Sequence, residues 1–289
     1  MTRKRSGNLF IHLILIAGGV MMLLPFLWMI LTSFKTYQES IKMPPVFIPR
    51  ELFTAARESG NFFAGVFDNY SFLLDNVPYF GNLYFNTFAL IAIRIVCAAV
   101  FSSMAAYAFA RLEFPLKRFF FWIIMIQLMM PSEIFIIPQY RMVVALGLKN
   151  TLAALVFPGL VSAFGVFFMR QFYMSLPGEL FDAAKLDGCN HWQTFLYVAA
   201  PLTRTAVVAL SIFTAVFAWQ ELMWPMIVNS NNEQATLSVG LAKIQNMELV
   251  FKPTHFMAAA VLAMIPMVVI YMIFQKQFIE GIALTGTKS

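Results

Sequence analysis

The sequence predicts an all-α integral membrane protein with six transmembrane helices, and three observations support this fold class. Of the 289 residues, 60% are hydrophobic and only 12% are charged, and the mean hydropathy of +0.74 lies outside the usual balance of soluble domains. Six windows are long and apolar enough for a helix to cross a hydrocarbon layer of roughly 30 Å. None of these windows shows the residue alternation of a membrane β-barrel.

The expected spans cover residues 10–32, 85–110, 119–143, 151–173, 204–225 and 256–277. The first window is too long for a removable signal peptide, and no small-residue cleavage site follows it, so we expect it to remain as the first span. Since no repeat or soluble domain interrupts the spans, we expect residues 1–289 to form one transmembrane domain.

Lysine and arginine residues near the span ends predict the orientation, because basic segments are retained in the cytoplasm. With the N-terminus inside, the inner segments are the richer in basic residues, among them Arg111, Arg118 and Arg170. Both termini and the 174–203 loop are therefore expected to be cytoplasmic, and the 36–84 and 226–255 loops external. The net charge of +6 is then a topology signal facing anionic lipid rather than a sign of nucleic-acid binding.

Two charged residues fall inside expected spans. Glu133 lies between Pro131 and Pro138, each of which removes a backbone donor and bends or breaks a helix. A broken, charged span is costly unless it lines a wet pathway or its charge is paired inside the protein, and Arg94 of the second span is a candidate partner. Arg94 itself must face a partner or water, or reach toward the outer surface.

A short helix is expected within the 174–203 loop. Ser175 or Pro177 can open it, and Gly188 is a natural stop, which leaves about ten helical residues. Leu180, Phe181 and Ala184, with Ala183 beside them, form a small apolar face narrow enough to fit a groove. Acidic residues in the first turns suit the helix dipole.

A second helix is expected after this stop. Trp192, Phe195 and Leu196 follow the i, i+3, i+4 spacing up to Pro201, which is typical of a helix lying along the membrane interface. If a partner holds the first helix in a groove, forces on that partner would reach the fourth and fifth spans. An ordinary interfacial hairpin without a partner is the alternative.

The stretch Glu179-Leu-Phe-Asp-Ala-Ala-Lys-Leu-Asp-Gly188, followed by Phe195 and Pro201, resembles the Glu-Ala-Ala loop of binding-protein-dependent ABC transporter permeases. The resemblance covers nearly the whole chain and is greatest to carbohydrate-importing permeases of the smaller maltose-type membrane subunit. Asp182 stands where the family usually has glutamate. Other matching stretches are Thr32–Lys35, Asn69-Tyr70, Asn86-Thr87, Ala106–Phe114, Trp224-Pro225, Thr236-Leu237, Gly240-Leu241 and Gln275–Gly281.

The resemblance implies a type I ABC importer permease fold and assigns residues to two partner contacts, whereas the pathway candidates are polar, charged or aromatic residues in or near the expected spans. Those that would dock on a separate ATPase are Glu179, Asp182, Ala183, Ala184, Asp187 and Gly188. Candidates for the translocation pathway are Asn86, Arg94, Gln127, Glu133, Trp219, Gln220 and Glu221, for which hydrogen bonding between buried helices is the alternative. Candidates for contact with a solute-binding protein are Asn229, Asn231 and Asn232.

The same resemblance implies the partners and the substrate class. We expect a second homologous permease in a heterodimer, two copies of an ABC ATPase and an extracytoplasmic solute-binding protein, assembled at a bacterial inner membrane. The expected cargo is an oligosaccharide or related carbohydrate. A polyol or glycerol-phosphate importer, in which Arg94 would serve an anion, is one alternative, and an ion-coupled secondary carrier working alone is another.

Catalysis is not expected from this chain. Gly281–Ser289 has some of the spacing of a phosphate-binding loop, but it is one residue out of register and no helix follows it. The three histidines are dispersed, and no metal-ligand spacing or catalytic arrangement is present. ATP and Mg²⁺ are therefore expected to bind the partner ATPase, and this chain is expected to bind no cofactor.

Overall fold

A computed structural model describes residues 3–49, 66–246 and 252–286, and these residues form helices joined by turns, without strands. The all-α prediction is confirmed. Residues 50–65 and 247–251 of the two expected external loops lie outside the described part. The chain divides into two compact units: Met1–Phe80 with Leu241–Val269, and Gly81–Gly240 with Ile270–Ser289.

The first unit joins the end of α1 (Arg3–Ser33) to α5 (Asp68–Asn76). The Asn69 side-chain amide donates to the carbonyls of Ser33, at 2.8 Å, and Lys35, at 2.9 Å. The hydroxyls of Tyr70 and Ser33 lie 2.7 Å apart. These bonds satisfy backbone acceptors that the end of α1 leaves open.

Lys35 is buried directly after α1, before the short helix α2 (Tyr37–Ile41). Its ammonium lies 3.9 Å from the ring centroid of Trp28 and 3.3 Å from the Thr32 hydroxyl oxygen. Burial lowers the pKa of Lys35, and the nearby carboxylate of Glu39 opposes that shift. The last helix of the chain, α18 (Pro253–Gly286), contributes His255, whose ring stacks on Phe72 of α5 at 4.0 Å.

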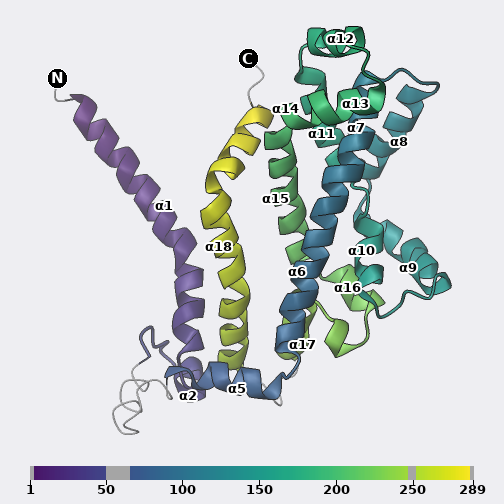
Figure 1. Cartoon of the computed structure of the whole chain (residues 1–289). Helices are drawn as coiled ribbons and strands as arrows, with labels where there is room; N and C mark the ends of the chain where they lie inside the picture. Colours follow the sequence, from purple (N-terminus) through teal and green to yellow (C-terminus); the bar gives the residue numbers. More distant parts are fainter. Residues whose placement is uncertain (1–2, 50–65, 247–251, 287–289) are drawn as a thin grey trace. The chain divides into compact units, whose positions relative to one another are not determined.

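The second unit is built on one long helix, made of α6 (Phe80–Cys97), the π-helical turn η1 (Ala98–Ser102) and α7 (Ser103–Arg111). α7 packs along α11 (Ala163–Ser175), and α11 also contacts α15 (Arg204–Gln220) (Figure 1). α11 comes close to the π-turn at Gly165, where a Cβ atom would lie 2.9 Å from the Ser102 hydroxyl oxygen. The buried residues of this core include Ala98, Ala106, Tyr107, Val166, Met169, Tyr173 and Leu210.

Three helix pairs in the second unit are sharply bent. α8 (Lys117–Met129) meets the 3₁₀ turn η2 (Ser132–Phe135) and α9 (Ile136–Ala145) at 107°. Pro131 lies at that break, where it cannot donate a backbone hydrogen bond, so the bend expected there is confirmed.

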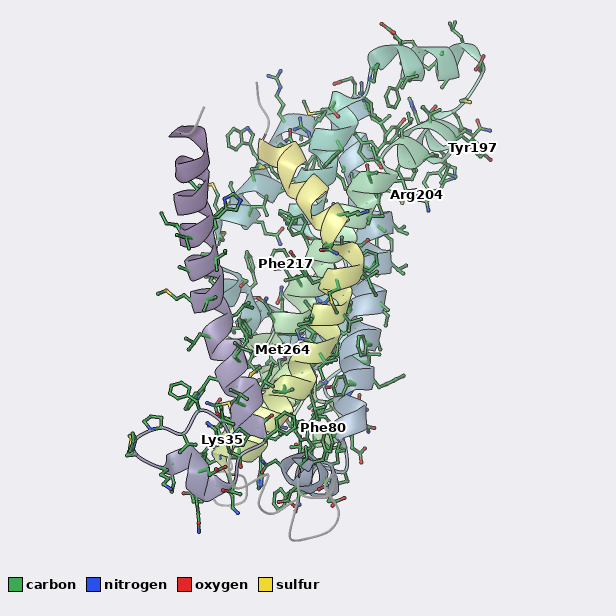
Figure 2. The ribbon with its side chains drawn as sticks, turned by 90° about the vertical axis from the view of Figure 1, so that its left-hand side faces the viewer. Lys35, Phe80, Tyr197, Arg204, Phe217 and Met264 are labelled. Atoms are coloured by element: carbon green, nitrogen blue, oxygen red, sulfur yellow. The ribbon has the colours of Figure 1, made fainter. Side chains whose placement is uncertain are left out.

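The other two bends flank α11 and α15. α10 (Leu152–Val156) with η3 (Phe157–Gly159) meets α11 at 45°. The segment His191–Leu202 meets α15 at 76°, and it consists of α13 (His191–Thr194), the π-turn η4 (Phe195–Ala199) and α14 (Ala200–Leu202). Figure 2 shows Tyr197 of η4 and Arg204 of α15 toward the same end of the second unit, and Phe217 further along α15.

Among the described residues, three helical segments are long and apolar enough to cross a membrane: Ile11–Ser33, Phe80–Arg111 and Pro253–Lys276. The number rises to six if each bent pair counts as one span. The six-span prediction therefore depends on the bent pairs, and the cytoplasmic location of the termini stays a prediction.

The second unit also contains a cluster of short helices after α15. These are α16 (Met223–Val228), the 3₁₀ turn η5 (Asn232–Gln234) and α17 (Leu237–Asn246), of which α17 continues into the first unit. α16 packs on α9 and α10. The indole nitrogen of Trp224 donates to the carbonyl of Ala154 at 3.0 Å, which holds α16 against α10.

Candidate functional site

The 174–203 loop contains the short helix that the sequence predicts, here α12 (Gly178–Leu186). Pro177 precedes its first residue and Glu179 lies in its first turn. Gly188 ends it with a φ of +80°, in the left-handed region that side chains disfavour. In Figure 1, α12 and α13 lie at the end of the second unit where α7 ends.

The apolar residues of α12 do not all point the same way, which corrects the expected groove-fitting face. Phe181 and Ala184 are buried against this chain itself, with only 6% and 5% of their surface exposed. Leu180, Ala183 and Leu186 are exposed instead. Because Phe181 and Ala184 already pack on their own scaffold, a partner can meet only the opposite side of the helix.

That opposite side is acidic. Glu179, Asp182 and Asp187 are exposed, and exposed Ala183 lies among them. Lys185 forms a long i,i+3 ion pair with Asp182 at 3.9 Å, which is worth little at a solvated surface. The exposed face of α12 therefore offers carboxylates and a small residue.

The buried side of α12 is held by a cluster that we call the Arg111 anchor, formed by Tyr107, Arg111, Tyr173, Phe181 and Phe195. The Arg111 guanidinium lies 4.2 Å from the centroid of the Phe181 ring. It also donates to the carbonyl of Tyr173, at 2.9 Å from Nε and 2.6 Å from Nη2. Tyr107 contacts the rings of both Phe181 and Phe195, at 6.3 and 5.3 Å between centroids.

Two further bonds complete this attachment. Arg111 donates to the carbonyl of Leu176, just beyond α11. The hydroxyls of Tyr173 and Ser103 lie 2.6 Å apart and join α11 to α7. α12 is thus connected to both α7 and α11. Beside it lies a cleft of about 380 Å³, whose lining includes Arg111, Glu113, Asp182, Lys185 and His191.

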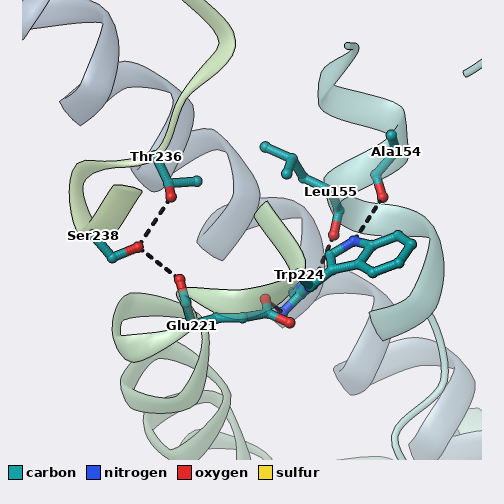
Figure 3. A network of polar contacts seen from close by, with 7 residues as sticks. Ala154, Leu155, Glu221, Trp224, Thr236 and Ser238 are labelled. Carbon is teal, nitrogen blue, oxygen red and sulfur yellow. Dashed lines mark hydrogen bonds and ion pairs between the residues drawn. The ribbon is translucent and has the colours of Figure 1, made fainter. Parts of the chain in front are cut away.

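A second polar site lies in the middle of the long Phe80–Arg111 segment, and Figure 3 shows Leu155, Glu221 and Trp224 at this site. Nη1 of Arg94 donates to Oε2 of Glu221 at 2.5 Å, and Nη2 donates to the carbonyl of Leu155 at 2.7 Å. Glu221 occupies the break between α15 and α16. Nε of Arg94 is buried without a hydrogen-bond partner among the described residues. The pair joins α6, α10 and the end of α15.

Gly159 permits this arrangement. A Cβ atom at that position would lie 2.6 Å from Nε of Arg94, which is closer than non-bonded atoms approach. Glu133, the partner that the sequence analysis considered for Arg94, lies elsewhere: it is exposed in η2 and accepts from the Ser132 hydroxyl at 3.3 Å. The interpretation of an Arg94–Glu133 pair is therefore wrong, because the packing of α15 brings Glu221 to Arg94.

The remaining pathway candidates form no hydrogen bond or ion pair with Arg94 or the carboxylate of Glu221 among the described residues. Asn86 is buried and its amide donates to the carbonyls of Glu233, at 2.7 Å, and Ala235, at 3.0 Å, which agrees with the alternative of internal hydrogen bonding. Trp219 packs edge-on against Phe88 at 5.7 Å. Gln127 on α8 and Gln220 at the end of α15 are exposed.

The residues that follow η5 pack against the first half of α6, around Leu83 and Thr87. The backbone amide of Leu237 donates to the Thr87 hydroxyl at 2.9 Å, and the Ser238 hydroxyl donates to the carbonyl of Glu221 at 2.6 Å. A Cβ atom at Gly240 would lie 2.3 Å from a methyl carbon of Leu83. The motif stretches Asn86-Thr87, Thr236-Leu237 and Gly240 are thus parts of one packing contact.

The three asparagines expected to contact a binding protein differ in exposure. Asn229 is only 1% exposed, and its amide donates to the carbonyl of Gln234 at 2.9 Å. This burial removes Asn229 from any partner-facing surface and corrects its assignment. Asn231 and Asn232 are exposed, and the Asn231 side chain accepts from the backbone amide of Glu233.

Sequence reasoning missed the residues that attach α12. Arg111, Tyr107 and Tyr173 were not candidates, although Arg111 and Tyr107 lie in the matching stretch Ala106–Phe114. The available signal was an arginine at the end of a span, which was interpreted only as a marker of orientation.

Comparison with known proteins gives concordant results. Residues 98–283 match the family model described as "Binding-protein-dependent transport system inner membrane component". The chain is 32% identical over 287 residues to the sn-glycerol-3-phosphate transport system permease protein UgpE of Rhizobium meliloti (strain 1021), covering 99% of each chain. It is 33% identical over 235 residues to the arabinooligosaccharides transport system permease protein AraQ of Halalkalibacterium halodurans, covering 77% of this chain and 82% of the relative.

A solved structure shares the fold. It is described as "Crystal structure of a bacterial ABC transporter involved in the import of the acidic polysaccharide alginate", and one of its chains superposes with a TM-score of 0.74 at 20% identity, covering 96% of this chain and 98% of that chain. The architecture is accordingly the type I ABC permease fold. From the family match and the full-length relatives, the chain belongs to the inner membrane components of binding-protein-dependent transport systems.

Proposed function

We propose that this chain is the membrane-spanning permease subunit of an ATP-driven, solute-binding-protein-dependent importer for a carbohydrate or a related polyol compound. It binds no nucleotide: separate ATPase subunits bind ATP and Mg²⁺ and carry out hydrolysis. The observation that carries the proposal is the two-sided α12, which has one face fixed to the spans and an acidic face exposed.

In this proposal α12 couples ATPase closure to the spans. Glu179, Asp182 and Asp187 contact the ATPase, Ala183 allows its close approach, and Gly188 lets the chain turn sharply after the helix. Ala184 instead packs inward. The Arg111 guanidinium contacts both Phe181 of α12 and the carbonyl of Tyr173 in α11. Displacement of α12 therefore moves α7 and α11, and the spans change between inward-open and outward-open states.

The assembly we propose contains a second homologous permease, two copies of the ATPase and an extracytoplasmic solute-binding protein in a bacterial inner membrane. Residues 1–289 act as one transmembrane permease domain, with both termini and the 174–203 loop in the cytoplasm. Asn231 and Asn232 remain available to the binding protein on the other side. The family match leaves no support for an ion-coupled carrier working alone.

An oligosaccharide is the first candidate cargo, and glycerol phosphate is the second. Relatives named for arabinooligosaccharides and for sn-glycerol-3-phosphate support these classes, the latter over 98% or more of both chains. Arg94 does not favour a phosphate site on this chain, because Glu221 and the Leu155 carbonyl already occupy its two terminal nitrogens. A phosphate would have to displace the carboxylate of Glu221, which pairs directly with Arg94.

The test reconstitutes the full assembly in lipid and records ATP turnover with the binding protein across a panel of saccharides and glycerol phosphate. Asp182→Ala combined with Asp187→Ala should abolish substrate-stimulated turnover while insertion and assembly persist. Asp75→Ala, which removes an exposed carboxylate of α5 in the first unit, is the control and should retain stimulation. Unchanged stimulation in the double variant would refute docking through α12.

A further inference from the structure

A cleft of about 550 Å³ opens where α7 ends and α8 begins, next to the cleft beside α12, with which it shares Glu113. Its lining includes the cations Lys117, Arg118 and Arg170, and one carboxylate, Glu113. Three positive charges less one negative charge leave a net charge of +2 on these side chains. Arg170 comes from α11 and Phe109 from α7, so the cleft is shared by α7, α8, α11 and the connection before α8.

The cations of this cleft differ in how they are held. Lys117 pairs with Glu113 at 3.1 Å. The Arg170 guanidinium lies 4.1 Å from the centroid of the Phe121 ring, and its Nε donates to the carbonyl of Phe109 at 3.3 Å. Neither Arg118 nor Arg170 forms an ion pair with any residue in the described part of the chain. Two guanidinium groups thus lack a carboxylate to neutralise them.

An apolar stripe leads from the cleft along α8. Trp122 lines the cleft and is 65% exposed, and Ile126 and Met129 follow it at helical spacing with 53% and 83% exposed. No residue of α8 is buried within this chain. A cationic cleft at the start of the helix therefore continues directly into an exposed apolar surface.

We propose that this cleft and stripe bind an anionic phospholipid. Its phosphate is held by Arg118 and Arg170, since guanidinium groups match phosphate oxygens in geometry and charge. An acyl chain lies along Trp122, Ile126 and Met129, with the indole at headgroup level, where tryptophan is favoured. The cleft supplies the charge and α8 supplies the apolar surface, which together fit an amphiphile rather than a free anion.

The test uses the full chain, in the assembly with which it purifies, in nanodiscs of phosphatidylcholine containing increasing fractions of phosphatidylglycerol brominated on its acyl chains. Bromine quenches a nearby indole, and subtraction of the Trp122→Phe variant isolates the Trp122 signal. Half-maximal quenching should occur at a lower mole fraction of brominated phosphatidylglycerol than of brominated phosphatidylcholine. Arg118→Gln should raise the half-quenching fraction of phosphatidylglycerol about fivefold, the effect expected of one arginine at an anionic surface.

Arg204→Gln is the matched control. Arg204 is likewise exposed at the start of an apolar helix (Figure 2). It lines a separate cleft with Val100, Trp192 and Leu196, where no other described lining residue is a cation. This variant should leave the half-quenching fraction unchanged. Equal effects of the two variants, or equal quenching by the two lipids, would overturn the proposal in favour of general surface charge.

Two more outcomes also count against it. If inorganic phosphate removes the preference for phosphatidylglycerol, the cleft is a site for soluble anions. If Trp122 is quenched by neither lipid, another subunit covers α8. These readouts do not depend on transport, so the lipid site and the proposed function can fail separately.

Discussion

Two arginines on one continuous helix are held in opposite ways. Arg94, in the middle of the Phe80–Arg111 segment, pairs with the carboxylate of Glu221. Arg111, its last residue, binds the carbonyls of Tyr173 and Leu176 and the ring of Phe181, and it forms no ion pair with the described residues. A charge surrounded by apolar helices needs a counter-charge. At a helix terminus, backbone carbonyls of a neighbouring helix end suffice.

The difference predicts different consequences of substitution. Losing Glu221 leaves the buried guanidinium of Arg94 without a counter-charge, and losing Arg94 leaves the partly buried carboxylate of Glu221 unpaired. Losing Arg111 leaves carbonyls near the end of the unit, where water can replace the guanidinium. The interior pair should therefore dominate stability, and the Arg111 anchor should dominate the attachment of α12.

The largest effect is expected from Glu221→Met, which should lower the free energy of unfolding by about 3–5 kcal/mol because Arg94 keeps its buried charge. Arg94→Met should cost less, because the Glu221 side chain is 27% exposed and its carboxylate stays partly solvated. The double variant should recover most of the loss, since it buries no charge. Thermal unfolding of the purified protein in detergent measures all three. A double variant no more stable than the worse single variant would contradict the pairing argument.

The next effect concerns Arg111→Lys. Lysine keeps the charge but cannot donate to two carbonyls while stacking on Phe181, so we expect a loss of about 1.5–3 kcal/mol. Hydrogen exchange should localise this loss to α12 and leave α6 protected. Leu186→Ala, at a residue 90% exposed on the same helix, is the control and should change neither quantity. Exchange that rises uniformly over the second unit would argue against a local anchor.

The smallest effect is expected from Gly159→Ala. The added Cβ must push Nε of Arg94 away from its present position, which should cost about 1–3 kcal/mol. Gly81→Ala is matched to it, because a Cβ at Gly81 meets nothing within 4 Å. Combining Gly159→Ala with Arg94→Met should remove most of the Gly159 penalty. Equal destabilisation by the two alanine variants would show that the Arg94 site tolerates the clash.

Local signals in the sequence predicted much of this architecture. Hydropathy placed the apolar segments, Pro131 predicted the break between α8 and α9, and Pro177 and Gly188 bounded α12. Such features depend on residues near one another in the chain. They need no knowledge of what packs against the helix.

The partners of Arg94, Phe181 and Asn229 depend on long-range packing, which the sequence pattern does not report. Arg94 selects Glu221 rather than Glu133 because the end of α15 reaches α6, and no local pattern reports that approach. Phe181 matched the requirement of a partner's groove, yet the same apolar ring fits the Tyr107–Arg111 surface of its own chain. Asn229 likewise lies in a polar, turn-prone stretch but is enclosed by the residues that follow it.

The π-turn η1 lies on the long helix between Arg94 and Arg111. Successive residues of an α-helix are set about 100° apart around its axis, so deleting one residue of this turn would rotate one arginine by that angle relative to the other. One of them would then point away from its partners. The π-turn η1 thus sets the relative direction of the Arg94 and Arg111 side chains around the axis of this helix, although several helical turns separate them.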